Sequence, residues 1–493
     1  MNITTLQNLT QGRFGRKIAY TNVEEINESN IVKVLGKAIS VFNYNKPAIK
    51  YLWDYKNGTQ PIISRVKAIR EDINNKIVEN HAWEIVQFKN AQTYGEPIQY
   101  ISRKQDDNAS ENVSKLNDYA TVANKPVKDI SSGEWTSAVG TGFKAIQRKG
   151  GKVPFRITVP TPMNTFIIYS SYTEEPMLAV QHLKDENDNM YYLCYDDTFE
   201  YKIQNSNLLS YGLTEDGQTI YKQLHLFGGI PIVEFPNNQD RISDIELVID
   251  LLDAINNMAS NRMDAIEQFV QSWVKFVNCD VDETSFNEMK RQGALMVKST
   301  KDKQADVSIM TQELNQSQTQ VAKDDLWDNV LTISAIPNKE GSTGGDTAGA
   351  VQLRNGWDFS KQRAKLKDPY IVEGEKRLAQ LIINAVNLAN GENTLPIDLI
   401  DMDVIISHSP TDNMYVKAEV YTMLVNNGIH PLIAISTCGL WGDAEKVFTN
   451  SKEYLDKMLD KLYASTDMSE AEINEQTKKA QELIGKNQDN RLK

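Results

Sequence analysis

Five histidines are the residues of this sequence best suited to bind a metal ion or transfer a proton. None has the paired spacing of a zinc-binding helix, and none lies near a cysteine at ligand spacing. The three cysteines are far apart, which argues against a disulfide framework and indicates a reducing compartment. We therefore expect no metal site, no cofactor and no catalytic residue among them. These residues are His81, His182, His225, His408, His430, Cys194, Cys279 and Cys438.

Gly344 and Gly345 belong to a glycine-rich segment that could in principle cradle a phosphate. A P-loop continues with Lys and then Ser or Thr, and it follows a buried strand. Here Asp346 occupies the lysine position, and the preceding pattern is helical. Because a carboxylate repels phosphate, we expect no nucleotide binding and interpret the glycines as a mobile loop. Gly140 and Gly142 lack the third glycine of a dinucleotide fingerprint and fall inside a helical pattern, which favours close helix packing.

A basic cluster stands out in an otherwise acidic chain. The sequence has 53 basic and 66 acidic residues, a net charge of −13, which excludes a freely exposed DNA-binding protein by bulk charge. Two interpretations of the cluster remain open: a solvated helix near a kink, or contact with a polyanion or with acidic neighbours. Its members are Lys361, Arg363, Lys365 and Lys367.

The elements that must position these residues change in type along the chain. Residues 28–89 have helical periodicity, with Pro47 in the first turn of one helix and Ile77 in the next. A loop at 103–111 precedes two further helices, at 112–123 and 127–149.

Residues 153–235 have the alternating pattern of an antiparallel β-meander. The run from Asp185 to Asn189 resembles the start of a calcium loop, but Met190 stands where that loop needs Gly, so we predict a hairpin turn.

Long amphipathic helices dominate the second half of the chain. Ser243 and Glu246 form a capping box that opens a predicted helix at 243–275, roughly 50 Å long. Its six acids and two bases exclude a membrane span. A small mixed unit at 279–311 leads to a second helix at 319–334. A helix from Asp346 to about residue 389 should break at Asp368-Pro369. One strand, 402–407, and further helices follow.

Two classes of function are compatible with these patterns. One is a structural assembly component built around the long helices. The other is an enzyme, for example one that handles DNA, whose active site has no recognisable motif. An NTP-driven DNA enzyme would need a Walker lysine and an acidic partner, and neither is apparent. The structural class is therefore favoured.

The order of elements resembles that of the portal proteins of long-tailed bacteriophages, in the branch typical of Gram-positive hosts. The resemblance covers about residues 37–455. It includes YLWDYKNGTQPI at 51–62, INNKIVENHAWEIVQFK at 73–89 and Gly95-Glu-Pro97. The most specific stretch is IPIVEFPNN at 230–238, which continues into SDIELVIDLLDAINNMASN at 243–261. Ile336-Pro337, the glycine-rich loop and residues 349–363 complete it. Nothing is recognisable beyond residue 455.

This resemblance implies an α+β, mainly helical fold with the parts of a portal. Residues 1–240 would form the wing, 241–277 the stem helix, 278–314 a small α/β clip and 315–336 the second stem helix. Residues 337–348 would form the tunnel loop, 349–390 a long kinked helix, 391–430 a return segment of the wing, and 431–493 a helical crown with a disordered tail. The clip matches by position and not by residues.

The resemblance also implies which residues contact DNA, neighbouring subunits and docking partners. Those of the DNA-tunnel loop would be Asn338, Lys339, Glu340, Ser342, Thr343 and Asp346. Contacts to DNA or to neighbouring subunits would come from Lys361, Arg363, Lys365 and Lys367. The clip residues that dock terminase or a connector would be Asp282, Glu283, Glu288, Lys290 and Arg291.

The implied assembly is a ring of about twelve subunits at one capsid vertex. Double-stranded DNA would pass through it during packaging and ejection. The expected partners are the terminase large subunit, the major capsid and scaffolding proteins, and the head-tail adaptor, with no membrane. The expected location is the virion, after assembly in the host bacterial cytoplasm. The acidic excess suits a duct through which DNA slides, because many phosphate-neutralising lysines would bind DNA strongly and impede transport.

Overall fold

The computed structural model describes residues 14–68, 71–104, 107–214, 216–270, 273–277, 284, 287, 306–310, 316–338, 356–390, 394–408, 414–439, 441, 444–452 and 454. The chain divides into two compact units. Unit one comprises Met1–Gly95, Val127–Ile146 and Thr158–Gly374. Unit two comprises Glu96–Pro126, Gln147–Ile157 and Glu375–Lys493. Helices predominate over strands, which confirms the α+β class.

A seven-stranded sheet in unit one confirms the central part of the predicted meander. The first and last strands of the predicted span, β4 (Phe155–Thr158) and β13 (Ile232–Pro236), belong to a separate three-stranded sheet. The order of the seven-stranded sheet is β1 (Ala19–Thr21), β5 (Thr165–Ser170), β6 (Pro176–Lys184), β7 (Met190–Tyr195), β8 (Phe199–Gln204) and β12 (Lys222–Leu224), with β9 (Asn207–Leu209) also paired to β8. All pairs are antiparallel except β1 with β5. A small hairpin, β10 (Gly212–Leu213) with β11 (Thr219–Ile220), is separate. The Asp185 carboxylate accepts hydrogen bonds from the backbone N–H groups of Asn187 and Asn189, both at 2.8 Å, so this run is the predicted hairpin turn.

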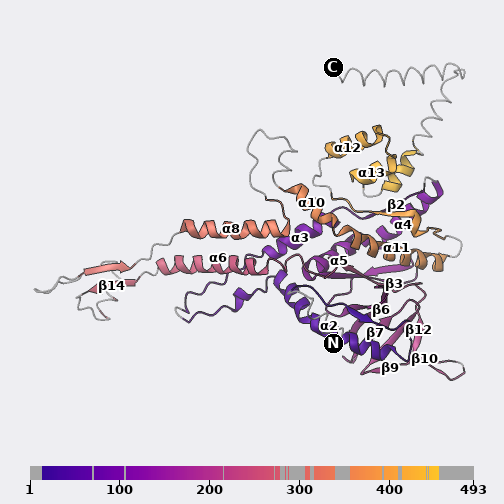
Figure 1. Cartoon of the computed structure of the whole chain (residues 1–493), viewed down its shortest axis with the longest axis horizontal. Helices are drawn as coiled ribbons and strands as arrows, with labels where there is room; N and C mark the ends of the chain where they lie inside the picture. Colours follow the sequence, from indigo (N-terminus) through magenta and orange to yellow (C-terminus); the bar gives the residue numbers. More distant parts are fainter. Residues whose placement is uncertain are drawn as a thin grey trace, which may run out of the picture. The chain divides into compact units, whose positions relative to one another are not determined.

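Helix α2 (Ile31–Lys56) packs against this sheet (Figure 1). The rings of Phe42 and Phe166 stack with centroids 4.7 Å apart. The placement of Pro47 in a first helical turn is wrong, because Pro47 lies inside α2. An internal proline costs a helix about 3 kcal/mol. Burial of Phe42 before it and Ile49 after it, in two different cores, offsets that cost.

Helix α3 (His81–Tyr94) begins later than its periodicity predicts, since Ile77 lies outside it. Asn80 caps α3 by accepting a hydrogen bond from the Trp83 N–H. The preceding residues 74–79 form an extended strap along α6 (Ile249–Val270). The backbone N–H groups of residues 75, 77 and 79 donate to the side chains of Asp264, Ser260 and Asn256 at 2.7, 3.0 and 2.8 Å. These three acceptors are buried and form a polar stripe on α6, which replaces the hydrogen bonds of a helix.

The predicted helix 127–149 is two elements, helix α5 (Lys125–Val139) and strand β3 (Thr141–Arg148). Gly140 separates them with φ +90°, and a Cβ there would lie 1.9 Å from the Arg241 carbonyl oxygen. Gly140 and Gly142 therefore do not lie inside a helix, although both pack closely, Gly142 against the Ser132 carbonyl. β3 pairs antiparallel with β13 (Ile232–Pro236). Residues 141–146 are all buried, so periodicity could not distinguish this strand from a buried helix.

Helix α6 is shorter than the predicted 243–275. The capping box forms in part: Glu246 accepts from the Ser243 N–H at 3.1 Å, and the Ser243 hydroxyl accepts from the Ile245 N–H at 3.2 Å rather than from that of Glu246. The same hydroxyl lies within hydrogen-bond distance of the carbonyls of Ser137 and Ala138. The residues before Ile249 are turns, so α6 spans about 33 Å. Strand β14 (Trp273–Val277) replaces the predicted end of the helix, because it pairs with β15 (Asp306–Met310).

Helix α8 (Gln316–Ser334) confirms the second predicted helix and packs beside α6 (Figure 1). The next predicted helix is two helices, α10 (Trp357–Lys365) and α11 (Asp368–Asn390). The break falls at residues 366–367, just before the predicted Asp368-Pro369. Pro369 lies in the first turn of α11, where a proline is tolerated because its missing N–H would have no partner within the helix. Of the described residues, no helix is both long and apolar enough to cross a membrane.

Unit two is built around a short sheet of β2 (Gln99–Ser102) and β16 (Met402–Ile405). Its helices include α4 (Asp107–Val122), α12 (Met414–Asn426) and α13 (Pro431–Cys438). The predicted loop 103–111 is wrong in its second half, where α4 begins, while the predicted strand 402–407 is confirmed over its first four residues. The fully buried Glu375 carboxylate accepts from the Tyr100 hydroxyl at 2.7 Å and pairs with Lys125 at 2.8 Å.

Candidate functional site at the ends of the connection from α8 to α10

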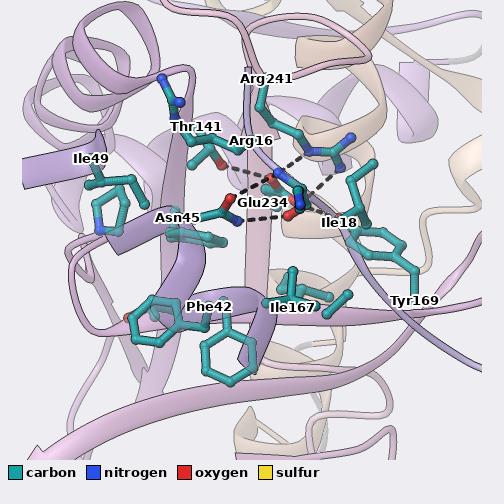
Figure 2. A pocket seen from close by; sticks show the side chains of 17 residues that line it. Arg16, Ile18, Phe42, Asn45, Ile49, Thr141, Ile167, Tyr169, Glu234 and Arg241 are labelled. Carbon is teal, nitrogen blue, oxygen red and sulfur yellow. Dashed lines mark hydrogen bonds and ion pairs between the residues drawn. The ribbon is translucent and has the colours of Figure 1, made fainter. Parts of the chain in front are cut away.

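A cavity of about 50 Å³ lies beside the N-terminal segment, residues 14–18 (Figure 2). It has room for only a few water molecules. The Glu234 carboxylate at its wall accepts from Arg241 at 3.1 and 3.2 Å, from the Thr141 hydroxyl at 2.7 Å, and from the Tyr169 hydroxyl. Burial alone would raise the pKa of Glu234, but the Arg241 guanidinium and the hydroxyl hydrogen bonds lower it. Because these polar groups bond one another, the cavity is structural.

The N-terminal segment is fixed by the same region. Arg16 forms an ion pair with Glu246 at 2.8 Å, and its backbone N–H donates to the Asp240 carbonyl at 2.9 Å. The Asn45 side chain exchanges two hydrogen bonds with the backbone of Lys17. The segment therefore holds the turn between β13 and α6.

The end of α8 has a definite geometry. Ala335 has φ +51°, a left-handed conformation that favours glycine. Its N–H donates to the Thr332 carbonyl at 3.2 Å, and the Ile336 N–H donates to the Leu331 carbonyl at 2.9 Å. This pattern is a Schellman motif, and its apolar residues Leu331 and Ile336 belong to one core. The chain thus leaves α8 through Pro337 and Asn338 in a fixed direction.

Helix α3 contacts both ends of the connection from α8 to α10. The Lys89 ammonium donates to the Ala335 carbonyl at 3.4 Å, at the end of α8. On α10, the Ser360 hydroxyl accepts from the Gln92 amide at 3.1 Å. The ring of Trp357, also on α10, lies 6.2 Å from that of Phe88. The described residues on both sides of the connecting segment, residues 339–355, therefore contact one helix, α3.

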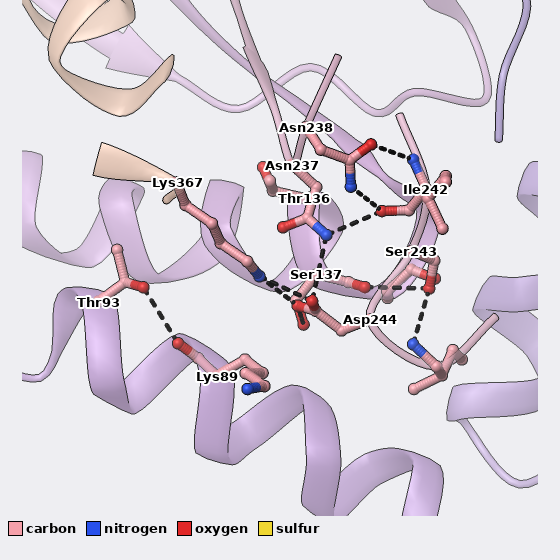
Figure 3. Close-up of polar contacts among 12 residues, drawn as sticks. Lys89, Thr93, Thr136, Ser137, Asn237, Asn238, Ile242, Ser243, Asp244 and Lys367 are labelled. Atoms are coloured by element: carbon pink, nitrogen blue, oxygen red, sulfur yellow. Dashed lines mark hydrogen bonds and ion pairs between the residues drawn. The ribbon is translucent and has the colours of Figure 1, made fainter. Parts of the chain in front are cut away.

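The buried carboxylate of Asp244 lies among the lysines near these contacts. Asp244 accepts from the Lys367 ammonium with both oxygens at 2.7 Å and from the Ser137 hydroxyl at 2.7 Å (Figure 3). Burial alone would raise the pKa of Asp244, but the charges of Lys367 and Lys89 lower it below the usual range. Asp244 is therefore ionised at neutral pH and holds the turn between α10 and α11.

Lys89 is the unusual member of this group (Figure 3). The residue is only 9% exposed. Burial lowers its pKa to about 8, against the attraction of Asp244 and with the repulsion of Lys367 and Arg363. Lys89 therefore titrates near neutral pH, which an ordinary lysine does not.

The structure places some of the predicted site residues and not others. Asn338 is half-buried at the end of α8. Lys361, Arg363 and Lys365 lie on α10, and Arg363 lies over the ring of Phe359 at 5.9 Å. Lys367 is engaged with Asp244 inside the chain. The others lie outside the described residues: Lys339, Glu340, Ser342, Thr343 and Asp346 of the predicted tunnel loop, and Asp282, Glu283, Glu288, Lys290 and Arg291 of the predicted clip.

Sequence analysis did not identify Lys89, Asp244 or Ala335. Asp244 was visible only as part of a capping box, and Lys89 only as a polar position in a helix. Among the histidines, His81 contacts Glu79 and Glu84. In the part of the chain that the structure describes, no three histidine, cysteine or acidic side chains are grouped to hold a metal ion.

Comparison with known proteins identifies the family. No curated protein matches the chain. A chain of the "Virion of native gene transfer agent (GTA) particle" is similar at 8% identity and TM-score 0.42, over 70% of this chain and 85% of that one. A chain of the "Neck of empty GTA particle computed with C6 symmetry" is similar at 9% identity and TM-score 0.42, over 71% and 90%. The family model "Phage portal protein, SPP1 Gp6-like" matches residues 35–458. Because that match covers most of the sequence, the chain belongs to the SPP1 Gp6-like family of phage portal proteins, which are structural components of the virion and not enzymes.

Proposed function

We propose that this protein forms a ring of about twelve subunits at one vertex of a phage capsid and that DNA is packaged and ejected through its centre. Terminase would dock on the ring during packaging and a head-tail adaptor would replace it later. The ring would assemble with capsid and scaffolding proteins in the cytoplasm of a bacterial host, which the resemblance suggests is Gram-positive. In this proposal residues 1–240 and 391–430 form the wing, 241–277 and 315–336 the stem, 278–314 the clip, 337–348 the tunnel loop, 349–390 the long helical part that follows it, and 431–493 the crown.

The observation that carries this proposal is the uneven burial of the pair α6 and α8. In the first half of α6, Leu252 and Ile255 lie in the core of the subunit itself. In its second half, Met263 and Ile266 are about 40% exposed, and Val321 on α8 is 60% exposed. A neighbouring subunit packed against these residues would remove them from water. The length of the predicted helix 243–275 indicates that its apolar face packs partly on neighbouring subunits. Because Ile255 is buried within the subunit, we propose such packing for the second half of α6 only.

A tunnel loop at residues 337–348 is supported by α3, which contacts described residues on both sides of the connecting segment. A loop that must meet passing DNA needs a fixed base. Lys339 could then contact phosphate briefly, while Glu340 and Asp346 would prevent tight binding. Lys361, Arg363 and Lys365 on α10 would make further contacts with DNA or with a neighbour, and the clip acids and bases would dock terminase. With −13 per subunit, twelve subunits would carry a formal charge on the order of −156, which opposes retention of DNA.

Imaging and native mass spectrometry of the purified protein test the ring. We expect a ring with a central hole and no ATP hydrolysis. Ile266→Glu places a charge in the proposed contact and should yield monomers or small oligomers. Tyr172→Glu, a matched change at a residue that is 73% exposed on the β5–β6 turn, should leave the ring intact. Compact monomers that hydrolyse a nucleotide would refute the proposal, as would rings that Ile266→Glu leaves unchanged.

Deletion of residues 341–345 tests the tunnel loop separately. If the loop lines the tunnel, rings should form and join procapsids, but DNA packaging or retention should fail. Particles with normal genome content would show that the segment only connects α8 to α10.

A further inference from the structure

Lys89 differs from the other buried lysines of this chain in its partner. Lys144 pairs with the Asp129 carboxylate at 2.5 Å and Lys125 with Glu375 at 2.8 Å, so the charge of each is compensated. Lys89 is also buried, but it makes no ion pair with any carboxylate in the described part of the chain. Its hydrogen bond goes to a backbone carbonyl, that of Ala335. An unpaired buried charge is costly, so this arrangement calls for an explanation.

The end of α8 supplies partial negative charge to Lys89, because the Ala335 carbonyl that accepts from it lies one residue beyond the last residue of this helix. The last carbonyl groups of a helix lack partners within it and carry the negative end of its dipole. Lysines near such an end are favourable, and they usually come from the helix itself. Here the lysine comes from α3, 246 positions away in the sequence, and reaches the one residue of the motif that has left-handed geometry.

We propose that Lys89 is a positioning residue that caps α8 from outside and fixes the point at which the chain leaves this helix for the connecting segment. The inference rests on the proposed function, in which residues 337–348 form the tunnel loop, and it adds the residue that fixes the end of α8 just before that loop.

The charged groups that face Lys89 determine the pH range in which its ammonium is charged and can cap α8. They are Asp244 on the segment before α6, Lys367 on the turn between α10 and α11, and Arg363 on α10. Asp244 is already shared with Lys367, so it attracts Lys89 without pairing with it. Because the pKa of Lys89 is lowered to about 8, the charge is present at pH 7 and lost by about pH 9.5. The cap should weaken over that interval.

Hydrogen exchange of the full-length protein tests the cap directly. In Lys89→Met the amides of Ala335 and Ile336 should exchange about tenfold faster than in the wild type at pH 7. Comparison at each pH cancels the intrinsic effect of pH on exchange, and this difference should shrink as pH rises to 9.5. Lys50→Met, which removes an exposed lysine of α2 that pairs with Asp54, should leave these two amides unchanged. Equal exchange in wild type and Lys89→Met, or a difference that does not change with pH, would overturn the inference.

Measuring the DNA content of assembled particles tests this inference and the proposed function separately. With Lys89→Met, rings should form at the normal yield, but particles should contain less DNA. If exchange changes as expected while deletion of 341–345 leaves packaging normal, the cap is real and the tunnel role of the loop is refuted. If exchange is unchanged, the cap is refuted whatever the DNA content.

Discussion

Replacing Lys89 with Met should make the protein more stable while impairing the end of α8. The difference between a free lysine pKa of 10.5 and about 8 corresponds to about 3 kcal/mol of burial cost at pH 7. Methionine has a similar unbranched stem and carries no charge. The variant loses the hydrogen bond to the Ala335 carbonyl, which costs about 1 kcal/mol. The net expectation is a gain of about 2 kcal/mol.

The sign of the pH dependence follows from the lowered pKa of Lys89. Below about pH 8 the lysine is charged in both the folded and the unfolded protein, so the full cost applies. Between about pH 8 and 10.5 the folded protein releases the proton while the unfolded chain keeps it. Unfolding then takes up a proton, so the wild type gains stability as pH rises. The advantage of Lys89→Met should therefore be complete below pH 8 and vanish by about pH 10.5.

Denaturant unfolding followed by tryptophan fluorescence measures this difference. Trp53 and Trp135 stack with ring centroids 3.4 Å apart and pack on the core that contains Leu331 and Ile336. Their emission therefore reports on the structure around α8. As a control, Lys144→Met should destabilise by about 3–5 kcal/mol, because it leaves Asp129 buried without a partner. A Lys89→Met protein that is less stable than the wild type at pH 7, or equally more stable at pH 7 and pH 10.5, would refute this reasoning.

Three further changes test other features. Gly140→Ala should destabilise by about 3 kcal/mol or more in thermal unfolding, because its Cβ would meet the Arg241 carbonyl, while Gly150→Ala, with open space around it, should have little effect. Glu234→Gln should lower stability by about 3–5 kcal/mol, since Arg241 would remain buried without a counter-charge; a loss below 1 kcal/mol would contradict the assigned network. Ala335→Gly should stabilise by about 1 kcal/mol in denaturant unfolding by relieving a left-handed alanine, and a loss of stability would show that the motif is not strained.

The parts of the fold that sequence predicts well are those governed by local pattern. The meander follows from alternating β-branched and aromatic residues, and the break near Pro369 follows from proline geometry. The errors arise where distant residues decide. Strand β3 is buried on both faces, so it has no period of two. Ile77 has helical spacing, but its N–H donates to Ser260 of a helix that is far away in the sequence.

The candidate site is less predictable for the same reason. The resemblance to portal proteins implied a tunnel loop at 337–348, which stays a prediction, and it did not indicate which residues fix the ends of the connection. The bond from Lys89 to Ala335 joins residues 246 positions apart, and neither residue has a local signal that would pair them. Lys367 appeared as one of four clustered bases, and only the position of Asp244 distinguishes it from the others.

The strap along α6 limits how these two segments can change. Its contacts recur every two residues of extended chain, about 6.6 Å apart. Those of the polar stripe recur every four helical residues, about 6.0 Å apart. The two spacings differ by about 0.6 Å per contact, so the strap and the helix stay aligned over only a few contacts. At a fifth contact the mismatch would reach about 2.4 Å. The strap and the polar stripe of α6 therefore match in one register only, and over a short length. The strap and α6 lie 177 to 189 positions apart in the sequence. An insertion that preserves their contacts must therefore add two residues to the strap for each four residues added to the helix.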